Sequence, residues 1–308
     1  MAEFLSRRPV TLLTPFTGIQ GLEFSYDEGV EPHLFSLARV AREKLEAGIA
    51  IARAKGGEVP ANGDLALVQY RNPHSPGYRY DTLRRTFSVV TGGGKERFYD
   101  YLASAFAYRE DHSYNPIMPF AVSATLVTPK GEVFFELRSM SLTDFPGKAH
   151  VFGGACRPGE SPDAAIRRAL RMKFGLNGTR FTVEWTGAGL ENLNHILELF
   201  CVVRLSEEET SQFSRAKYFR EDYPDATLLH LSFENVLQLL GYGMERWNPS
   251  GYLNLLCALA HLGQVCADEA SEFLDEQFER LTTEPYQHVH PAEQYLALAD
   301  QLIGAQAP

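Results

Sequence analysis

The sequence predicts an α+β protein, because strand-like segments and helix-like segments fall in separate groups along it. A hairpin pattern covers residues 121–138, and a long apolar run covers residues 195–205. Both are typical of strands that lie in a buried sheet. Segments with apolar residues at helical spacing precede and follow these strands.

The N-terminal part predicts a smaller α+β unit. Residues 32–55 have helical periodicity, and residues 95–108 predict a second helix. Residues 65–70 and 86–90 predict strands. The Pro-containing stretch 71–80 between them predicts a loop.

The central part begins after Pro116 and Pro119. Residues 121–127 and 132–138 predict two strands, joined by a turn with Pro129 and Gly131 where a type I turn favours them. The apolar run 195–205 predicts a further strand.

Helices dominate the C-terminal part. Residues 232–240 and 249–263 predict helices, the second with Asn248 as N-cap and Pro249 at its first position. The acidic stretches 268–279 and 291–303 predict surface or partner-facing helices. The expected domains are therefore an N-terminal α+β domain over 1–115, a central domain over 116–265 and a helical acidic tail over 266–308.

The composition excludes several classes of protein. The 308 residues have a formal net charge of −10, which argues against a general nucleic-acid binder. No apolar run reaches the ~18 residues of a membrane span, and the first residues do not resemble a signal peptide. Four cysteines form no CxxC pair, so a zinc ribbon is not expected. We expect a cytoplasmic protein that binds neither nucleic acid nor membrane.

The stretch FGGACRPGESPDAAIRRALRMKFGL, residues 152–176, carries the most specific spacing. Gly154 is followed after five residues by Glu160, and after seven more by Arg168. Ser161 and Pro162 predict a helix that starts directly after this loop. The frame is completed by Leu170, Gly175 and Leu176.

This spacing resembles the Nudix box, Gly-x5-Glu-x7-Arg-Glu-U-x-Glu-Glu-x-Gly-U, in which U is a bulky aliphatic residue. The resemblance implies an α/β/α sandwich with a mixed β-sheet. It also implies three helix glutamates that bind Mg²⁺ for hydrolysis of a diphosphate linkage. This sequence has Ala169, Met172 and Lys173 at those three positions. The wider layout is similar to UDP-sugar pyrophosphatases that have an N-terminal extension.

A first hypothesis follows from this change: the protein binds a nucleoside diphosphate derivative and no longer hydrolyses it. Lys173 would place an ammonium group where the resemblance implies a metal, and could bind phosphate directly without a metal or other cofactor. Arg138, Gly154 and Arg157 would add ligand contacts. The alternative for each arginine is an ordinary solvated side chain.

A second hypothesis keeps hydrolysis and moves the acids. Glu160, Glu191 and Glu198 would then hold Mg²⁺. Against it, Glu160 could simply pair with Arg168, and Glu198 with another arginine.

A third hypothesis is a structural domain with a vestigial pocket, in which the C-terminal helices contact a protein partner. A homodimer is also compatible with the resemblance.

Overall fold

The computed structural model describes residues 7–27, 36–55, 63–68, 70–72, 75–92, 98–110, 117–140, 142, 145–174, 181–215, 226–288, 292–293, 295–297 and 299–300. Parts of several predicted segments lie outside these ranges, namely residues 32–35, 69, 73, 74, 95–97, 175, 176, 291, 294, 298 and 301–303.

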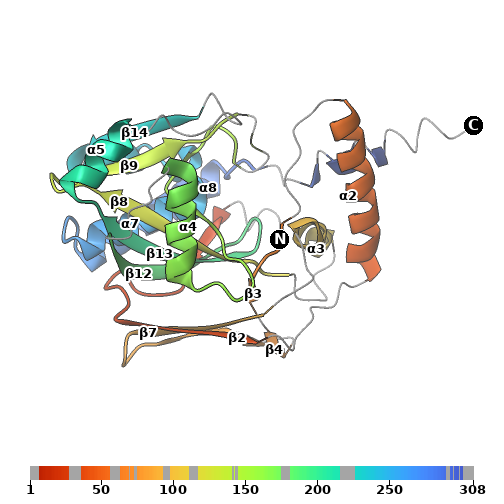
Figure 1. Ribbon diagram of the computed structural model, residues 1–308, viewed down its shortest axis with the longest axis horizontal. Helices are drawn as coiled ribbons and strands as arrows, with labels where there is room; N and C mark the ends of the chain where they lie inside the picture. Colours follow the sequence, from red (N-terminus) through yellow and green to blue (C-terminus); the bar gives the residue numbers. More distant parts are fainter. Residues whose placement is uncertain are drawn as a thin grey trace, which may run out of the picture.

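A mixed eight-stranded sheet forms the centre of the molecule (Figure 1). Its strand order is β1-β12-β13-β8-β9-β10, with β11 paired to β8 and β14 paired to β9. All pairs are antiparallel except β13 with β8. The strands are β1 (Val10–Leu12), β8 (Phe120–Val127), β9 (Glu132–Leu137), β10 (Ala149–His150), β11 (Phe152–Ala155), β12 (Thr182–Glu191), β13 (Ile196–Arg204) and β14 (Thr227–Ser232).

Helices cover both faces of this sheet (Figure 1). Helix α4 (Pro162–Phe174) packs on β11 and β8, and α7 (Pro249–His261) packs on β12, β13 and β8. Strand β13 is buried on both faces, so its apolar run is nearly continuous. Its Leu199 and Cys201 lie in the core shared with α4, whereas Phe200 lies in the core shared with α7. The α/β/α arrangement with a mixed sheet is thus confirmed.

Strands from the N-terminal part of the sequence form a second sheet. It contains β2 (Gly21–Asp27), β7 (Thr86–Gly92) and β3 (Leu67–Val68) in that order, with β6 (Tyr78–Asp81) also paired to β7. A separate short pair joins β4 (Tyr70–Asn72) and β5 (Ser75–Pro76). The prediction of a loop over 71–80 was therefore wrong in part, because Tyr78 and Tyr80 pair with Val89 and Phe87.

The remaining helices are α2 (Ser36–Ala54), α3 (Phe98–Glu110), α5 (Glu207–Arg215), α6 (Phe233–Gly241), the short 3-10 helix η1 (Met244–Arg246) and α8 (Ala267–Thr283). Of these, α2, α3, α6 and α8 lie in segments that were predicted to be helical, whereas α5 and η1 were not predicted. Helices α2 and α3 pack against each other. Asn248 caps α7 as predicted, because its Oδ1 accepts hydrogen bonds from the backbone N–H groups of Ser250 and Gly251.

Segments from the N-terminal and C-terminal parts of the chain join the central core. Strand β1 pairs with β12, and α8 buries Leu274 and Leu281 in the core that α7 also forms. One face of α8 is therefore covered by this chain, and the opposite face is exposed, as expected for a surface helix. That this exposed face contacts a partner stays a prediction. Within the described ranges, no helix combines the length and apolar character needed to cross a membrane.

Candidate functional site

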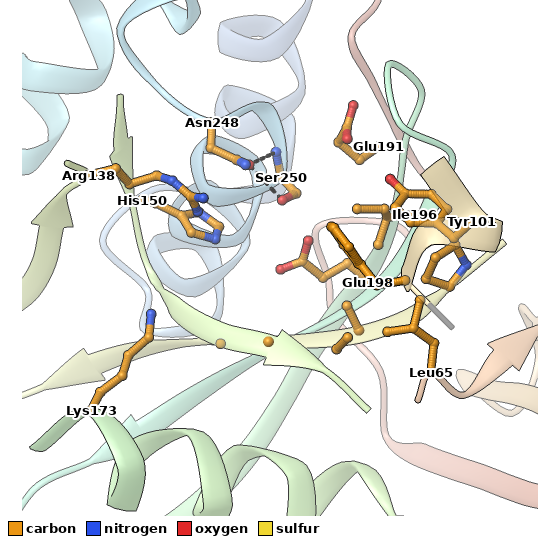
Figure 2. Close-up of a pocket in the computed structure, with 16 residues that line it drawn as sticks. Leu65, Tyr101, Arg138, His150, Lys173, Glu191, Ile196, Glu198, Asn248 and Ser250 are labelled. Atoms are coloured by element: carbon orange, nitrogen blue, oxygen red, sulfur yellow. Dashed lines mark hydrogen bonds between the residues drawn. The ribbon is translucent and has the colours of Figure 1, made fainter. Parts of the chain in front are cut away.

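A cavity of about 200 Å³ lies where β8, β11 and β13 meet the C-terminal end of α4 and the first turn of α7 (Figure 2). Its charged and polar residues divide into two groups. The apolar part of its wall comes from strand ends and from α3. The lining residues labelled in Figure 2 are Arg138, His150, Lys173, Glu191, Glu198, Asn248, Ser250, Tyr101, Leu65 and Ile196.

The first group is cationic and comes from three elements. Figure 2 shows Arg138, His150 and Lys173 on the same side of the cavity. Lys173 lies near the end of α4, and its Nζ is 3.4 Å from Oε1 of Glu136, a carboxylate that is 1% exposed. Arg138 follows β9 directly, and its backbone N–H donates to the carbonyl of Lys148. The pairing of β9 with β10 therefore fixes the place of Arg138 beside His150.

The second group is acidic and lies on the other side of the cavity (Figure 2). Glu191 ends β12, and its Oε1 accepts hydrogen bonds from the backbone N–H groups of Leu193 at 2.7 Å and Asn194 at 3.3 Å. Glu198 lies within β13 and is 6% exposed. The alternation of β13 turns it to the same face as Phe200. The sequence-based expectation that Glu198 points inward agrees with this burial.

Glu160 does not line the cavity. It forms an ion pair with Arg168, with Nε to Oε1 at 2.7 Å, and accepts a hydrogen bond from the backbone N–H of Arg157. Arg168 also donates to the carbonyl of Ala155 at 2.8 Å. Burial opposes ionisation of Glu160, but the hydrogen bonds and charge of Arg168, together with the Arg157 backbone N–H, outweigh it and lower the pKa of the carboxyl. This pair holds the loop before α4 in place.

The three positions that the Nudix resemblance links to metal ligands have different surroundings. Ala169 is buried in the core at 6% exposure, and Met172 is 63% exposed. Only Lys173 reaches the cavity. None of the three side chains offers an oxygen ligand to Mg²⁺, so these positions do not fit that metal. Among the described residues, no group of three His, Cys, Asp or Glu side chains could hold a metal ion.

Of the other two predicted ligand residues, Gly154 lines the cavity and Arg157 does not. A Cβ on Gly154 would meet no atom within 4 Å. Neighbouring Gly153 has the steric requirement instead, since a Cβ would lie 2.1 Å from the carbonyl oxygen of Val122. The side chain of Arg157 is exposed and is not part of the cavity wall.

Sequence reasoning missed His150 and the cavity role of Asn248 and Ser250. Asn248 was recognised only as a helix cap. Its backbone N–H donates to the carbonyl of Ala149, which ties the start of α7 to the strand that carries His150. His150 belongs to a strand of two residues and to no motif, so only the folded sheet reveals it.

Comparison with known proteins places this geometry in context. No protein-family model matches the chain, and no curated protein matches it. A MutT/Nudix family protein from Listeria innocua is similar in structure, with 15% identity, a TM-score of 0.36, and coverage of 47% of this chain and 94% of its own.

Two further solved structures are similar at the same level. A MutT protein from Methanosarcina mazei has 18% identity and a TM-score of 0.31, with coverage of 52% of this chain and 94% of its own. A Deinococcus radiodurans protein has 22% identity and a TM-score of 0.31, with coverage of 40% of this chain and 73% of its own.

Proposed function

We propose that this Nudix-like protein binds the phosphate groups of a nucleoside diphosphate derivative in the cavity, without a metal ion and without hydrolysing the ligand. The observation that carries the proposal is the meeting of Lys173 and Arg138 at one side of a single cavity. An ammonium and a guanidinium group supply charge-assisted hydrogen bonds to phosphate oxygens. Lys173 takes over the neutralising role that a metal would have.

The carboxylate Glu136 supports this reading. It lies beside Lys173 and is almost fully buried, so it fixes the ammonium group next to the cavity. Ser250 and Asn248 at the start of α7 add polar groups between the cationic and acidic sides. The cavity volume of about 200 Å³ lies below the ~300–1,000 Å³ of a typical ligand pocket, so it accommodates one part of a nucleotide derivative.

The test uses UDP-glucose as the probe. Calorimetric titration of the full chain is run with Mg²⁺ and with EDTA, and the same mixtures are assayed for released UMP. We expect equal binding in both conditions and no UMP. Lys173→Glu should weaken binding by about tenfold or more, the loss of one charge-assisted contact. Arg171→Glu reverses a charge on the exposed face of the same helix and should leave affinity within about twofold.

A second candidate is a hydrolase with relocated acids, since Glu191 and Glu198 line the same cavity. It requires Mg²⁺-dependent release of UMP that Glu198→Gln abolishes. Release of UMP in Mg²⁺, absent in EDTA, would replace the first proposal with this one. Unchanged affinity in Lys173→Glu would remove Lys173 from the first proposal.

A further inference from the structure

His150 occupies the centre of the cationic side of the cavity. In β10 it pairs with Glu136 of β9, the same carboxylate that contacts Lys173. Figure 2 shows its ring between Arg138 and Lys173. No box position or motif assigns a role to this residue.

The first turn of α7 holds the imidazole ring in place. His150 Nδ1 is buried and has no hydrogen-bond partner among the described residues. A Cβ built on Gly251 would lie 2.4 Å from this nitrogen and 3.2 Å from the Cα of His150. The ring therefore uses the space that a glycine leaves in α7. With Nδ1 enclosed, the edge that carries Nε2 is the part left to the cavity.

Several charged groups face the ring. Arg138 lies next to it along the sheet, Lys173 approaches from α4, and the partly positive first turn of α7 covers it. Glu136 is its cross-strand neighbour, and Glu191 and Glu198 face it across the cavity. Burial, followed by the charges of Arg138 and Lys173, holds the pKa of His150 well below its usual range. In the ligand-free protein at neutral pH the imidazole is therefore uncharged.

We propose that His150 is a third binding group for a dianionic oxyanion, and that it takes up a proton when the anion binds. This inference rests on the proposed function, because it needs an anion at Arg138 and Lys173. A dianion placed there offsets the repulsion that these two cations exert on a protonated imidazole. The imidazolium then donates Nε2–H to the anion as a charge-assisted hydrogen bond.

Anion binding and protonation of His150 are thermodynamically linked, and this linkage can be measured. Since binding favours protonation, protonation equally favours binding. Affinity should therefore rise as the pH falls from about 8 to about 6, with a limiting slope of about tenfold per pH unit. Sulfate is the cleanest probe, because it has no proton to exchange in this range.

The experiment is titration calorimetry of the full chain with sulfate and with UDP, in buffers that differ in ionisation enthalpy. We expect wild type to take up a fraction of a proton for each anion bound. NMR of the histidine rings, with the His150 signal assigned by its absence in His150→Gln, should show that sulfate raises the pKa of this residue. His150→Gln should bind sulfate with no proton uptake and with no dependence on pH. His230→Gln removes a histidine that pairs with Glu132, away from the cavity, and should keep the wild-type uptake.

The outcomes separate the two proposals. Sulfate binding to wild type with no proton uptake, or an NMR titration of His150 that sulfate does not change, overturns the role of His150 and leaves the proposed function intact. Failure of wild type to bind either sulfate or UDP overturns both. Gly251→Ala provides a second variant that keeps the imidazole but moves it, and should reduce proton uptake while Arg138 and Lys173 are unchanged.

Discussion

At the residue scale, the ion pair of Glu160 and Arg168 was within reach of the sequence, whereas His150 was not. The spacing of the loop and helix places the carboxylate and the guanidinium together, and pairing was one of the two roles considered for Glu160. His150 meets Arg138 and Lys173 only through the pairing of β10 with β9 and the packing of α4. No local pattern contains that information.

The ion pair predicts a pH-dependent loss of stability in Glu160→Gln. The folded pKa of Glu160 is lowered, so its contribution is present above the unfolded pKa and is lost as the pH falls through the folded value. At neutral pH we expect the variant to lose about 1–3 kcal/mol of unfolding free energy, because the largely buried Arg168 side chain loses its Glu160 carboxylate partner. Urea unfolding at neutral pH and near pH 3, below the ordinary carboxyl range of about 4, measures this difference.

Asp163→Asn is the matched control on the same helix. Asp163 pairs with Arg167 at 2.6 Å, but the two side chains are 49% and 33% exposed. Solvent screening should keep its effect below about 1 kcal/mol. A loss in Glu160→Gln that is equally large near pH 3 would contradict the ion-pair account.

At the element scale, the strands that the sequence missed contain turn-forming residues. Strand β12 includes Gly187 and Gly189, and a Cβ on Gly189 would lie 2.7 Å from Cζ of Phe200 in β13. These glycines permit close packing beneath α7, but in the sequence they resemble a loop. Pro76 and Gly77 similarly concealed the start of β6. Continuous apolar runs such as β13 were predicted correctly, because burial on both faces leaves an unmistakable pattern.

The start of α7 supports a prediction about capping. Asn248 is 4% exposed and accepts hydrogen bonds from Ser250 and Gly251. We expect Asn248→Ala to lose about 1–2 kcal/mol of unfolding free energy, since two buried N–H groups lose their acceptor. Ser232→Ala removes the exposed cap of α6, whose bond to Asn235 is 3.4 Å long, and should lose less than about 1 kcal/mol. Chemical denaturation compares the two, and equal losses would show that burial of the cap has no effect.

At the scale of the whole molecule, segments from outside the expected central domain contribute to the central sheet and to the core packed on it. Strand β1 extends the central sheet beside β12. The backbone of Ala66 accepts a hydrogen bond from the N–H of Phe120 in β8 and donates one to the carbonyl of Cys156, in the loop before α4. Such contacts join segments on both sides of the expected boundary at residue 115. Helix α8 packs against the central core in the same way, which joins segments on both sides of the expected boundary at residue 265. The boundaries themselves stay predictions, because shared packing does not say which segments unfold together.

Leu281→Ala addresses that question directly. Leu281 lies in α8 at 3% exposure and packs in the core formed by α7 and the central sheet. If α8 and the sheet unfold as one unit, the variant should lower the free energy of the main transition by about 2–5 kcal/mol, the loss expected for a buried leucine. Leu83→Ala changes a side chain that is 96% exposed and should leave that transition unchanged. Calorimetric unfolding distinguishes the alternatives, because an autonomous tail would show the loss in a separate minor transition while the main one kept its midpoint.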